Sequence, residues 1–598
     1  MIKQNQGGIS MKIKQKLMIL MCISALFLNA CNSSNSKQAD DGNDVVQTQS
    51  QAVEQETDVT KFTNDRFDEA DLYNEWTKSK TTIITMNEIG ISHDGDDTSG
   101  VTIDGKNIII SKSGNFSLTG ACADGSVTVD CKDEGNVRII LDNCSLTSQS
   151  GSALKIENAD KVVVTSSFNT SNLLADGQDY AGDEAACVSS KANLSFNGEG
   201  QLTILGNNKD AVSCEGDLKF VSGTYNINSK EDGVVSTQGI TLKNGSYTMQ
   251  SNGAGFKTTS TNDGEGFVGI ETGSYMLITG GNAIDATGSV YYLNGSLNIE
   301  TGLGNTLSDK ITAKGVQSGV DFEMYGGSAQ LNTADDAVSV GGNVKIATGC
   351  LNIASQDDGI VAGEDIEIAG GSIVLTQCVE GFESNSVNLK GGFVDINATD
   401  DGINVCGGND ASAGDERLGK NNIERSGEGE VNIDKTCINV KADADAIDVV
   451  GNLTITSGAV YLRGGQDEGN NSVDCSKEYV IKSGNVNAAG VDASVAAPSD
   501  ASAQNTVVFE YAEVQEPNTV VCVEDSKGNV VSCFAPAAPF SKAVISKETF
   551  KDGGKYSWFA ATIKEDVQTK YGEVSGDDIQ KGDKIADFTI EKGITTVK

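Results

Sequence analysis

The sequence predicts an all-β fold: a right-handed parallel β-helix with about 22 residues per coil, followed by a small antiparallel β cap or domain. The first observation is a repeat of acids at Asp336, Asp358, Glu380 and Asp401, spaced by 22, 22 and 21 residues. The second is that a short apolar strand, a glycine-containing turn and another strand recur between these acids. A period in the twenties with one such set per repeat is the signature of a solenoid. The third is composition: 69 glycines and only 4 prolines indicate turns made by glycine.

The first 31 residues resemble a bacterial lipoprotein signal peptide. Three lysines follow Met11 and precede the apolar run 17–28, which is too short to span a membrane stably. The run ends in Leu28-Asn29-Ala30-Cys31, which resembles a lipobox, in which the cysteine is lipidated. We expect residues 1–31 to carry the signal, Cys31 to anchor the chain to the bacterial envelope, and residues 32–61 to be a disordered tether. An ordinary signal peptide with a chance cysteine is the alternative.

Residues 62–484 are predicted to form the β-helix. The segment Phe62–Lys80 mixes acids with aromatic residues and is expected to cap the first coil, because an open solenoid end needs covering. Alternating strand patterns begin at Thr82, and a loop is expected from Asn169 to Asp183. A further polar loop is expected from Gly407 to Gly429, after which the repeat returns.

Residues 485–598 are predicted to form the C-terminal β cap or small β domain. Five apolar segments there suggest antiparallel strands: Thr506–Tyr511, Thr519–Glu524, Asn529–Phe534, Lys542–Ile545 and Lys555–Ala560. A hairpin turn is expected at Asp525–Gly528. Cys522 and Cys533 lie across this hairpin and are the best disulfide candidates, whereas most other cysteines are expected to be buried free thiols.

The order of these segments resembles one bacterial family. The strand motifs, the Asp-Asp-Gly-Ile repeats, the loop after the last repeat and the segment Asn529–Ser546 are similar to carbohydrate-binding parallel β-helix lipoproteins related to a clostridial polygalacturonate-binding protein. The resemblance covers residues from about 62 to 560. It implies a pectate-lyase-like fold, bound calcium and binding of pectin-type polysaccharides. The chain departs from the repeat at Ala254 and Asn282, so no calcium site is expected to span those two coils.

The repeated acids are candidate calcium ligands. Coils of a parallel β-helix are about 4.8 Å apart, so a 22-residue period stacks carboxylates about 5 Å from one another. Like charges this close repel by roughly 1 kcal/mol or more per pair. Calcium would neutralise them, because it takes six to eight oxygen ligands in flexible geometry. The candidates form an early pair and a longer later column: Asp210, Asp232, Asp335, Asp336, Asp357, Asp358, Glu380, Asp400, Asp401, Asp443, Asp445 and Asp448.

A purely structural role remains open for each acid, since an aspartate before glycine can cap a turn through its side chain. Transition-metal sites are disfavoured because His93 is the only histidine.

The charge of the chain limits its partners. A net charge of −40 disfavours nucleic acid and anionic lipid. An acidic polysaccharide would need a bridging cation, and calcium would supply it. We therefore expect a monomeric, extracellular, lipid-anchored protein that binds a polygalacturonate- or pectin-type polysaccharide through calcium, without catalysis. One alternative is a calcium-dependent polysaccharide lyase that uses Lys209, Lys230 or Lys257 as its base. The other is a structural stalk or adhesin.

Overall fold

The computed structural model describes residues 66–598 apart from 77–79, 88, 96, 181–185, 305–311, 407–426, 466–469, 492–494, 568 and 570. The predicted signal peptide, the tether and Cys31 lie outside the described residues, as does most of the predicted loop from Gly407. Residues Thr63–Lys598 form one compact unit. Within the described part, no helix is long and apolar enough to cross a membrane.

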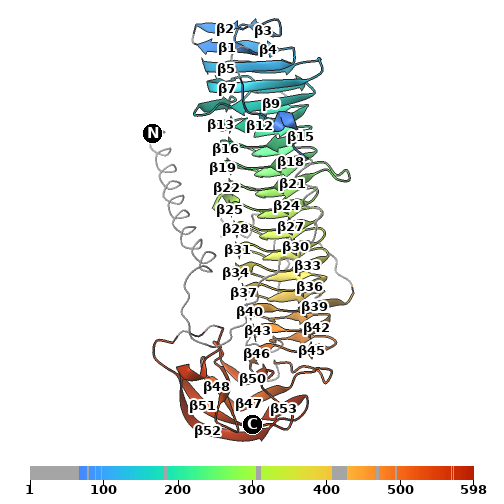
Figure 1. Ribbon diagram of the computed structural model, residues 1–598, viewed down its shortest axis with the longest axis vertical. Helices are drawn as coiled ribbons and strands as arrows, with labels where there is room; N and C mark the ends of the chain where they lie inside the picture. The colour runs from blue at the N-terminus through green and yellow to red at the C-terminus, as the bar shows by residue number, and fades with distance from the viewer. Residues whose placement is uncertain are drawn as a thin grey trace. The chain divides into compact units, whose positions relative to one another are not determined.

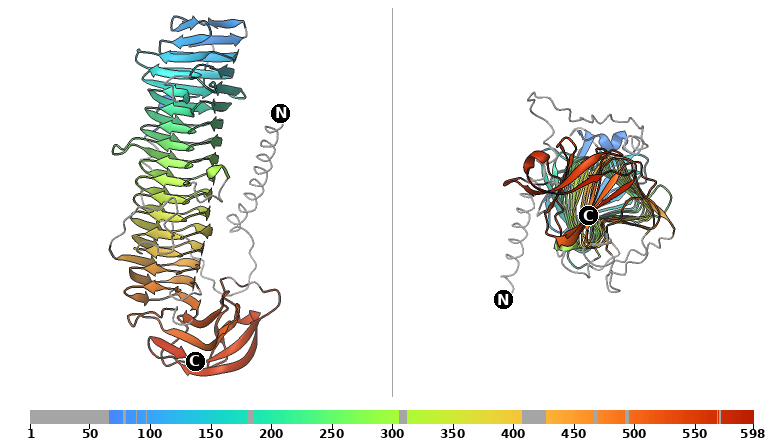
Figure 2. Two further views of the ribbon diagram at one scale, coloured as in Figure 1. Left: turned by 180° about the vertical axis from the view of Figure 1, so that it is seen from behind. Right: turned by 90° about the horizontal axis from the view of Figure 1, so that it is seen from below.

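The predicted parallel β-helix is confirmed. Successive coils stack so that each coil adds one strand to each of three parallel ladders (Figure 1). The strands of successive coils superpose when the stack is viewed from below (Figure 2). Within a coil the chain passes along a first, then a second, then a third face. Each strand pairs with the equivalent strand of the next coil. Val212 pairs with Val234 on the first face, and Leu218 with Ile240 on the second.

The three faces consist of short strands. The first face contains β6 (Ser126–Asp130), β8 (Leu154–Asn158), β11 (Ala186–Ser190), β14 (Asp210–Cys214), β17 (Val234–Ser236), β20 (Phe256–Thr258), β23 (Ile284–Ala286), β26 (Val316–Ser318), β29 (Val338–Val340), β32 (Ile360–Ala362), β35 (Phe382–Ser384), β38 (Ile403–Val405), β41 (Asp448–Val449) and β44 (Asp474–Cys475). The second face contains β9 (Lys161–Ser166), β12 (Asn193–Gly198), β15 (Asp217–Phe220), β18 (Gly239–Leu242), β21 (Phe267–Ile270), β24 (Val290–Tyr292), β27 (Phe322–Met324), β30 (Val344–Ile346), β33 (Asp365–Ile368), β36 (Ser386–Leu389), β39 (Gly429–Ile433), β42 (Gly451–Ile455) and β45 (Tyr479–Ile481). The third face contains β7 (Asn136–Thr147), β10 (Ser171–Ala175), β13 (Gln201–Gly206), β16 (Thr224–Ser229), β19 (Ser246–Ser251), β22 (Ser274–Thr279), β25 (Ser296–Glu300), β28 (Ser328–Thr333), β31 (Cys350–Ser355), β34 (Ser372–Cys378), β37 (Phe393–Ala398), β40 (Thr436–Lys441), β43 (Gly458–Arg463) and β46 (Asn485–Gly490).

The predicted loop Asn169–Asp183 contains a strand that sequence reasoning missed. Residues Ser171–Ala175 form β10, which pairs with β7 and β13 in the third face. The short run Leu173-Leu174-Ala175 is flanked by polar residues, so its apolar pattern is too brief to stand out as a strand. Tertiary pairing with the neighbouring coils supplies the hydrogen bonds that fix it.

The interior of the coils is apolar and repeats from coil to coil. Tyr225, Tyr247 and Tyr275 stack in the third face, with ring centroids 5.0 Å and 4.7 Å apart. Each hydroxyl donates to the carbonyl three residues earlier, at 2.5, 3.0 and 2.7 Å, so all three buried hydroxyls have an acceptor. A glycine with positive φ precedes each of these strands; at Gly245, a side chain would meet the preceding coil's backbone at 2.9 Å. Stacked tyrosines therefore depend on glycine turns that let the coils approach closely.

The N-terminal end is closed differently from the prediction. The strands there are β1 (Thr81–Asn87), β2 (Gly90–Asp94), β3 (Val101–Asp104), β4 (Asn107–Ile110) and β5 (Gly114–Cys122). β1 pairs with β2, and β3 with β4, as antiparallel hairpins at the end of the stack. The segment expected to be the cap lies instead along the second face, where it includes the short helix α3 (Glu69–Leu72). We call its described residues 66–76 the strap.

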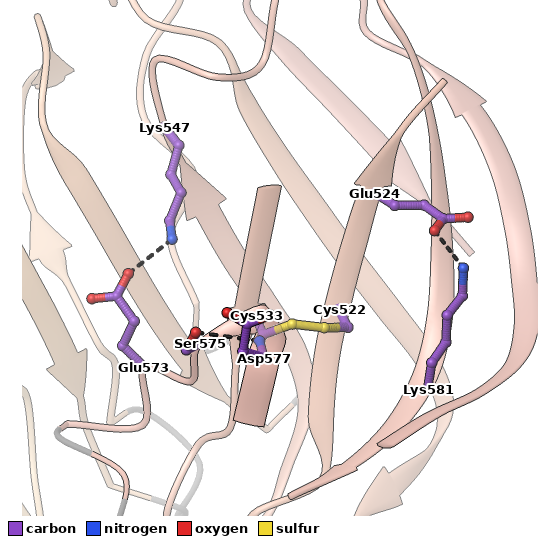
Figure 3. Close-up of a disulfide and its surroundings, with 8 residues drawn as sticks. All are labelled: Cys522, Glu524, Cys533, Lys547, Glu573, Ser575, Asp577 and Lys581. Carbon is purple, nitrogen blue, oxygen red and sulfur yellow. Dashed lines mark hydrogen bonds and ion pairs between the residues drawn. A yellow bond between two sulfur atoms is a disulfide. The ribbon is translucent and has the colours of Figure 1, made fainter. Parts of the chain in front are cut away.

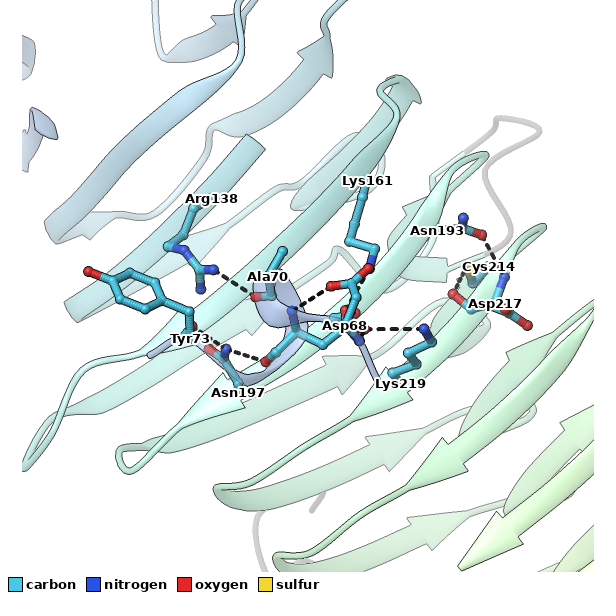
Figure 4. Close-up of polar contacts among 12 residues, drawn as sticks. Asp68, Ala70, Tyr73, Arg138, Lys161, Asn193, Asn197, Cys214, Asp217 and Lys219 are labelled. Carbon is cyan, nitrogen blue, oxygen red and sulfur yellow. Dashed lines mark hydrogen bonds and ion pairs between the residues drawn. The ribbon is translucent and has the colours of Figure 1, made fainter. Parts of the chain in front are cut away.

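The strap is held by polar groups that point outward from the solenoid (Figure 4). The Arg138 guanidinium donates to the Ala70 carbonyl at 2.8 Å, and the Asn197 amide donates to the Asp71 carbonyl at 2.8 Å. The Asp71 carboxylate is fully buried and lies 2.9 Å from the Lys161 ammonium and 3.2 Å from that of Lys219. Burial alone would raise the pKa of Asp71, but hydrogen bonds from Ser195 and Lys161 outweigh it and lower that pKa. Asp71 is therefore a buried anion that joins the strap to three adjacent coils.

The C-terminal segment contains the predicted antiparallel strands. They are β47 (Thr506–Gln515), β48 (Val520–Asp525), β49 (Val530–Phe534), β50 (Phe540–Ser546) and β51 (Lys555–Ile563), together with β52 (Ile579–Thr589) and β53 (Ile594–Val597). β46 of the last coil pairs antiparallel with β50, which ends the parallel stack. β49, β48, β51 and β52 form a separate sheet, in which the predicted Cys522–Cys533 disulfide joins paired positions (Figure 3).

We expect Asp71→Asn to lower the free energy of unfolding by about 3 kcal/mol, because it leaves Lys161 and Lys219 without a buried counter-charge. Urea denaturation followed by circular dichroism measures this change. Glu69→Gln, which changes an exposed acid two residues away in the same helix, is the matched control and is expected to change stability by less than about 0.5 kcal/mol. Equal effects of the two substitutions would contradict a specific role for Asp71.

Candidate functional site

The predicted acids line one corner of the solenoid, where the third face turns into the first. Strand pairing aligns one residue of each coil at this corner. This residue comes two positions before the first inward-facing apolar residue of the first-face strand, as Asp336 comes before Val338. We call this alignment the corner column. From the N-terminal side its members are Asp210, Asp232, Ala254, Asn282, Lys314, Asp336, Asp358, Glu380, Asp401, Asp445 and Asn471.

One oxygen of most acids in the corner column has a structural role. Asp210 Oδ1 accepts the backbone N–H of Asp232 at 2.9 Å, one coil further on. The same contact recurs from Asp358 Oδ1 to the Glu380 N–H at 3.0 Å, and from Asp401 Oδ1 to the N–H of its neighbour Asp445 at 2.7 Å. These contacts join neighbouring coils, so one oxygen of each of these aspartates has a structural role in the ladder. The second oxygen is what a ligand could use.

The column is interrupted at Ala254, Asn282 and Lys314. The first two interruptions were expected from the sequence. Lys314 was not, because an insertion places it 32 residues after Asn282 and breaks the 22-residue count. Asn282 still accepts the Lys314 backbone N–H at 2.9 Å, so the ladder continues without a charge there.

Asp335, Asp336 and Asp357 form what we call the upper cluster. One carboxylate oxygen from each lies within 4.8 Å of the others. The Lys314 ammonium enters this cluster, donating to Asp335 Oδ1 at 3.1 Å and to Asp336 Oδ2. Burial disfavours the charged amine, but the two carboxylates outweigh it and raise the pKa of Lys314. Calcium was predicted to neutralise these carboxylates, and Lys314 supplies part of that positive charge.

The next two acids of the column are buried. Burial, followed by the charges of Asp336 and Asp357, raises the pKa of Asp358 well above its ordinary value. Glu380 is 2% exposed, and its Oε1 accepts a hydrogen bond from the Asn404 amide at 3.2 Å. These two side chains therefore act within the fold and are not presented to solvent.

Asp445, Asp448 and Asp474 form a second group, the lower cluster. Their carboxylate oxygens also lie within 4.8 Å of one another, and Asp474 is exposed. Asp448 and Asp474 are paired in the β41–β44 ladder. Burial and then the neighbouring carboxylates raise the pKa of Asp445 to about 7 and that of Asp401 to about 8. The cluster thus brings three carboxyl groups together, and one of them, that of Asp474, is exposed to solvent.

The donor set of the lower cluster fits a hard divalent cation. Calcium prefers carboxylate oxygens, and three of them converge here. Sequence reasoning missed Asp474, because an insertion again precedes it. Its position one strand beyond Asp448 was the available signal.

The remaining predicted acids are not part of either cluster. Asp400 contributes like charge to Asp401 and Asp445. Asp443 lies close enough to Arg463 to interact with it electrostatically. Asp210 and Asp232 form an early site of their own, where Asp232 Oδ2 binds the Lys257 ammonium at 2.9 Å. The twelve predicted ligands are therefore divided among separate places along the column.

The contacts of Lys257 and Lys230, two of the lysines considered as a lyase base, do not favour the neutral amine that a base requires. The hydrogen bond from Lys257 to Asp232 raises the pKa of Lys257, whereas a base at neutral pH needs a lowered one. Lys230 is half exposed and lies 3.6 Å from Asp179. No specific geometry in the described residues favours the lyase alternative.

Part of the chain is similar to known proteins. Residues 104–359 match a family model described as "Carbohydrate-binding domain-containing protein". A protein of the same description from Acetivibrio thermocellus is 25% identical over 138 residues, which is 22% of this chain and 48% of that protein. The aligned part of the chain thus spans about half the length of this curated relative.

One solved structure, described as that of the polysaccharide lyase-like protein from C. thermocellum, gadolinium derivative, shows 21% identity and a TM-score of 0.38. The similarity covers 41% of this chain and 96% of that chain.

We expect Lys314→Met to destabilise the protein by roughly 3 kcal/mol, because it leaves Asp335 and Asp336 buried without their ammonium partner. Calcium at millimolar concentration is expected to recover part of the lost melting temperature in this variant. Lys345→Met, which removes an exposed lysine 3.8 Å from Glu323, is the matched control and should change stability by less than about 0.5 kcal/mol. Thermal unfolding with and without calcium tests both statements.

The pKa of Asp210 predicts a pH dependence of stability. Burial, then the charges of Asp232 and Glu231, raise this pKa from 3.8 to about 7. Between these values the folded protein keeps a proton that the unfolded chain releases, so this contribution to stability falls as pH rises from about 4 to about 7. After allowance for solvent screening, the fall is roughly 1–3 kcal/mol.

Asp210→Asn is expected to remove this part of the pH dependence, since the amide oxygen still accepts the Asp232 N–H without titrating. Urea denaturation at pH 4.5 and pH 8 measures the difference. Asp104→Asn, at an exposed position in β3, should keep the slope of the unmodified protein. An unchanged slope in Asp210→Asn would refute the assignment.

Proposed function

We propose that the protein binds an acidic polysaccharide of the polygalacturonate or pectin type, through calcium held at the lower cluster. The observation that carries the proposal is the convergence of Asp445, Asp448 and Asp474, with oxygens within 4.8 Å of one another and a raised pKa at Asp445. Like charges in such a group repel, and a divalent cation removes the repulsion. The match of residues 104–359 to a carbohydrate-binding family supports the class of ligand.

Calcium would serve as the bridge between an acidic protein and an acidic sugar. Asp445, Asp448 and Asp474 would hold the ion, and its remaining coordination positions would accept a uronate carboxylate. Without the ion, a chain with a net charge of −40 repels a polyuronate. Asp474 is exposed, which supports access of a surface polysaccharide to an ion bound there.

The first face offers the polysaccharide a continuous path. The segment that matches the carbohydrate-binding family ends at residue 359, before the lower cluster. The ladder from β32 through β35, β38 and β41 to β44 continues without a change of direction. A long polymer can therefore contact both the matched segment and the lower cluster, which suits binding rather than the processing of single sugars.

We also propose that the chain acts at the bacterial surface as a monomer, anchored through lipid at Cys31. The lipobox-like sequence around Cys31 supports this location, and a polysaccharide too large to enter the cell would be met there. Globomycin sensitivity of processing, together with labelling of the protein by a radioactive fatty acid, tests the anchor. Cys31→Ala should abolish the label and release the protein from membranes.

We expect the full-length protein to bind immobilised polygalacturonate in millimolar calcium and to lose this binding in excess chelator. Asp474→Asn should weaken binding at least tenfold, because it removes one charge from the cation site. Asp263→Asn, which changes an exposed acid in the loop after β20, is the matched control and should bind as the unmodified protein does. Surface plasmon resonance measures the affinities.

Three outcomes would count against the proposal. Undiminished binding in chelator would exclude the calcium bridge. Equal affinities of Asp474→Asn and the control would exclude the lower cluster. Binding of neutral polysaccharide alone would exclude the acidic ligand class.

A further inference from the structure

A cavity separates the last coils of the solenoid from the loops of the C-terminal segment. Its volume is about 230 Å³. Asn439, Tyr461 and Arg463 line one side, from strands β40 and β43 of the third face. Phe534, at the end of β49, and Tyr571, outside the strands, line it from the C-terminal segment. The cavity therefore lies on the third face, whereas the polysaccharide path proposed above follows the first.

One polar group that lines the cavity lacks a protein partner. The Nε–H of Arg463 is buried and has no hydrogen-bond acceptor. Buried donors and acceptors are nearly always satisfied, by protein or by something bound. A hydroxyl group of a bound ligand would supply the acceptor that Arg463 lacks.

Aromatic rings are grouped at the same place. Tyr571 lies 5.6 Å from Tyr461 and 5.8 Å from Phe393, measured between ring centroids. The Tyr461 hydroxyl donates to the Glu573 carboxylate, which also accepts from Asn485 at 2.9 Å. Lys547 binds the same carboxylate at 3.0 Å (Figure 3). The Tyr461 ring is thus fixed in place before any ligand arrives, which reduces the entropy cost of binding.

The charges around the cavity favour a neutral ligand. Arg463 interacts electrostatically with Asp443 and Asp395, and the Asn439 amide donates to Asp395 at 2.8 Å. Lys547 is matched by Glu573. Among the described residues that line the cavity, Arg463 is the charged one, and the two carboxylates offset it. An added carboxylate would therefore find no excess positive charge, in contrast to the calcium site proposed above.

The size of the cavity limits the ligand to one ring. Pockets for drug-sized ligands measure roughly 300–1,000 Å³. A cavity of about 230 Å³ falls below that range and suits a single six-membered sugar ring. Such a ring presents an apolar C–H face that can pack on an aromatic ring, and hydroxyls at its edge that can reach polar groups.

We propose that this cavity binds one neutral pyranose unit, free or at the end of a glycan, and does so without calcium. The sugar's C–H face packs against Tyr571 and Tyr461, and one hydroxyl accepts from Arg463 Nε. This site is separate from the polyuronate site and does not depend on it. The protein would then hold a charged polymer on one face and a neutral sugar on another.

Ligand-detected saturation-transfer NMR on the full-length protein, in excess EDTA, tests this inference. The probes are methyl glycosides of glucose, galactose, mannose and xylose, with methyl galacturonate as the charged comparison. We expect at least one neutral glycoside to give a signal and methyl galacturonate to give none. The chelator keeps the calcium-dependent site silent, so failure of one site is distinguishable from failure of the other.

Two variants assign the signal to the cavity. Arg463→Met keeps the aliphatic stem but removes the guanidinium, and Tyr571→Asn removes the ring at a residue with φ of 56°, where asparagine is tolerated better than alanine. Each is expected to reduce the signal at least fivefold. Tyr73→Ala, a half-exposed tyrosine on the strap, is the aromatic control and should leave it unchanged.

The absence of a signal from every neutral glycoside would overturn the proposal. A signal of equal strength in Arg463→Met would overturn it as well. Circular dichroism of this variant reports whether it is folded. A signal from methyl galacturonate alone would show an anion site instead.

Discussion

The hydrogen-bonded distance between coils is the constraint on which the whole structure depends. At about 4.8 Å, it places each residue directly beside its equivalent in the next coil. For apolar and aromatic residues this is favourable, as the stack of Tyr225, Tyr247 and Tyr275 shows. For acids it is unfavourable, since a repeated carboxylate meets its own charge one coil away. Several contacts in the corner column reduce that repulsion.

The column contains several different responses to the same problem. Backbone N–H groups bind one oxygen of Asp210, Asp358 and Asp401. Lys314 brings an ammonium into the upper cluster from the column itself. Raised pKa values at Asp358 and Asp401 favour a bound proton over a bare charge. At the lower cluster, we propose that a calcium ion does the same work. An exchangeable cation with open coordination positions can also bind the oxygens of a partner.

The fold was more predictable from the sequence than the site was. A period of 22 residues determines both the stacking and the faces, because a shift by one residue would expose the apolar side of a strand. The antiparallel strands and the Cys522–Cys533 disulfide were likewise predictable from local patterns. Counting along the chain failed wherever an insertion intervened, so Lys314 and Asp474 were missed although both lie in register with predicted acids. The strap was misplaced because its partners, Arg138 and Lys161, are distant in sequence and carry no pattern that points to it.

The strap also determines how the solenoid responds to a pulling force. The chain that enters at residue 66 does not join the stack at its end. It is bound first to its side, through Arg138 of β7, Lys161 of β9, Asn197 of β12 and Lys219 of β15. Tension applied from the N-terminal direction is therefore shared across several coils in shear, and their contacts must break together. A chain attached at the first hairpin would instead peel away one strand at a time, under a much smaller load.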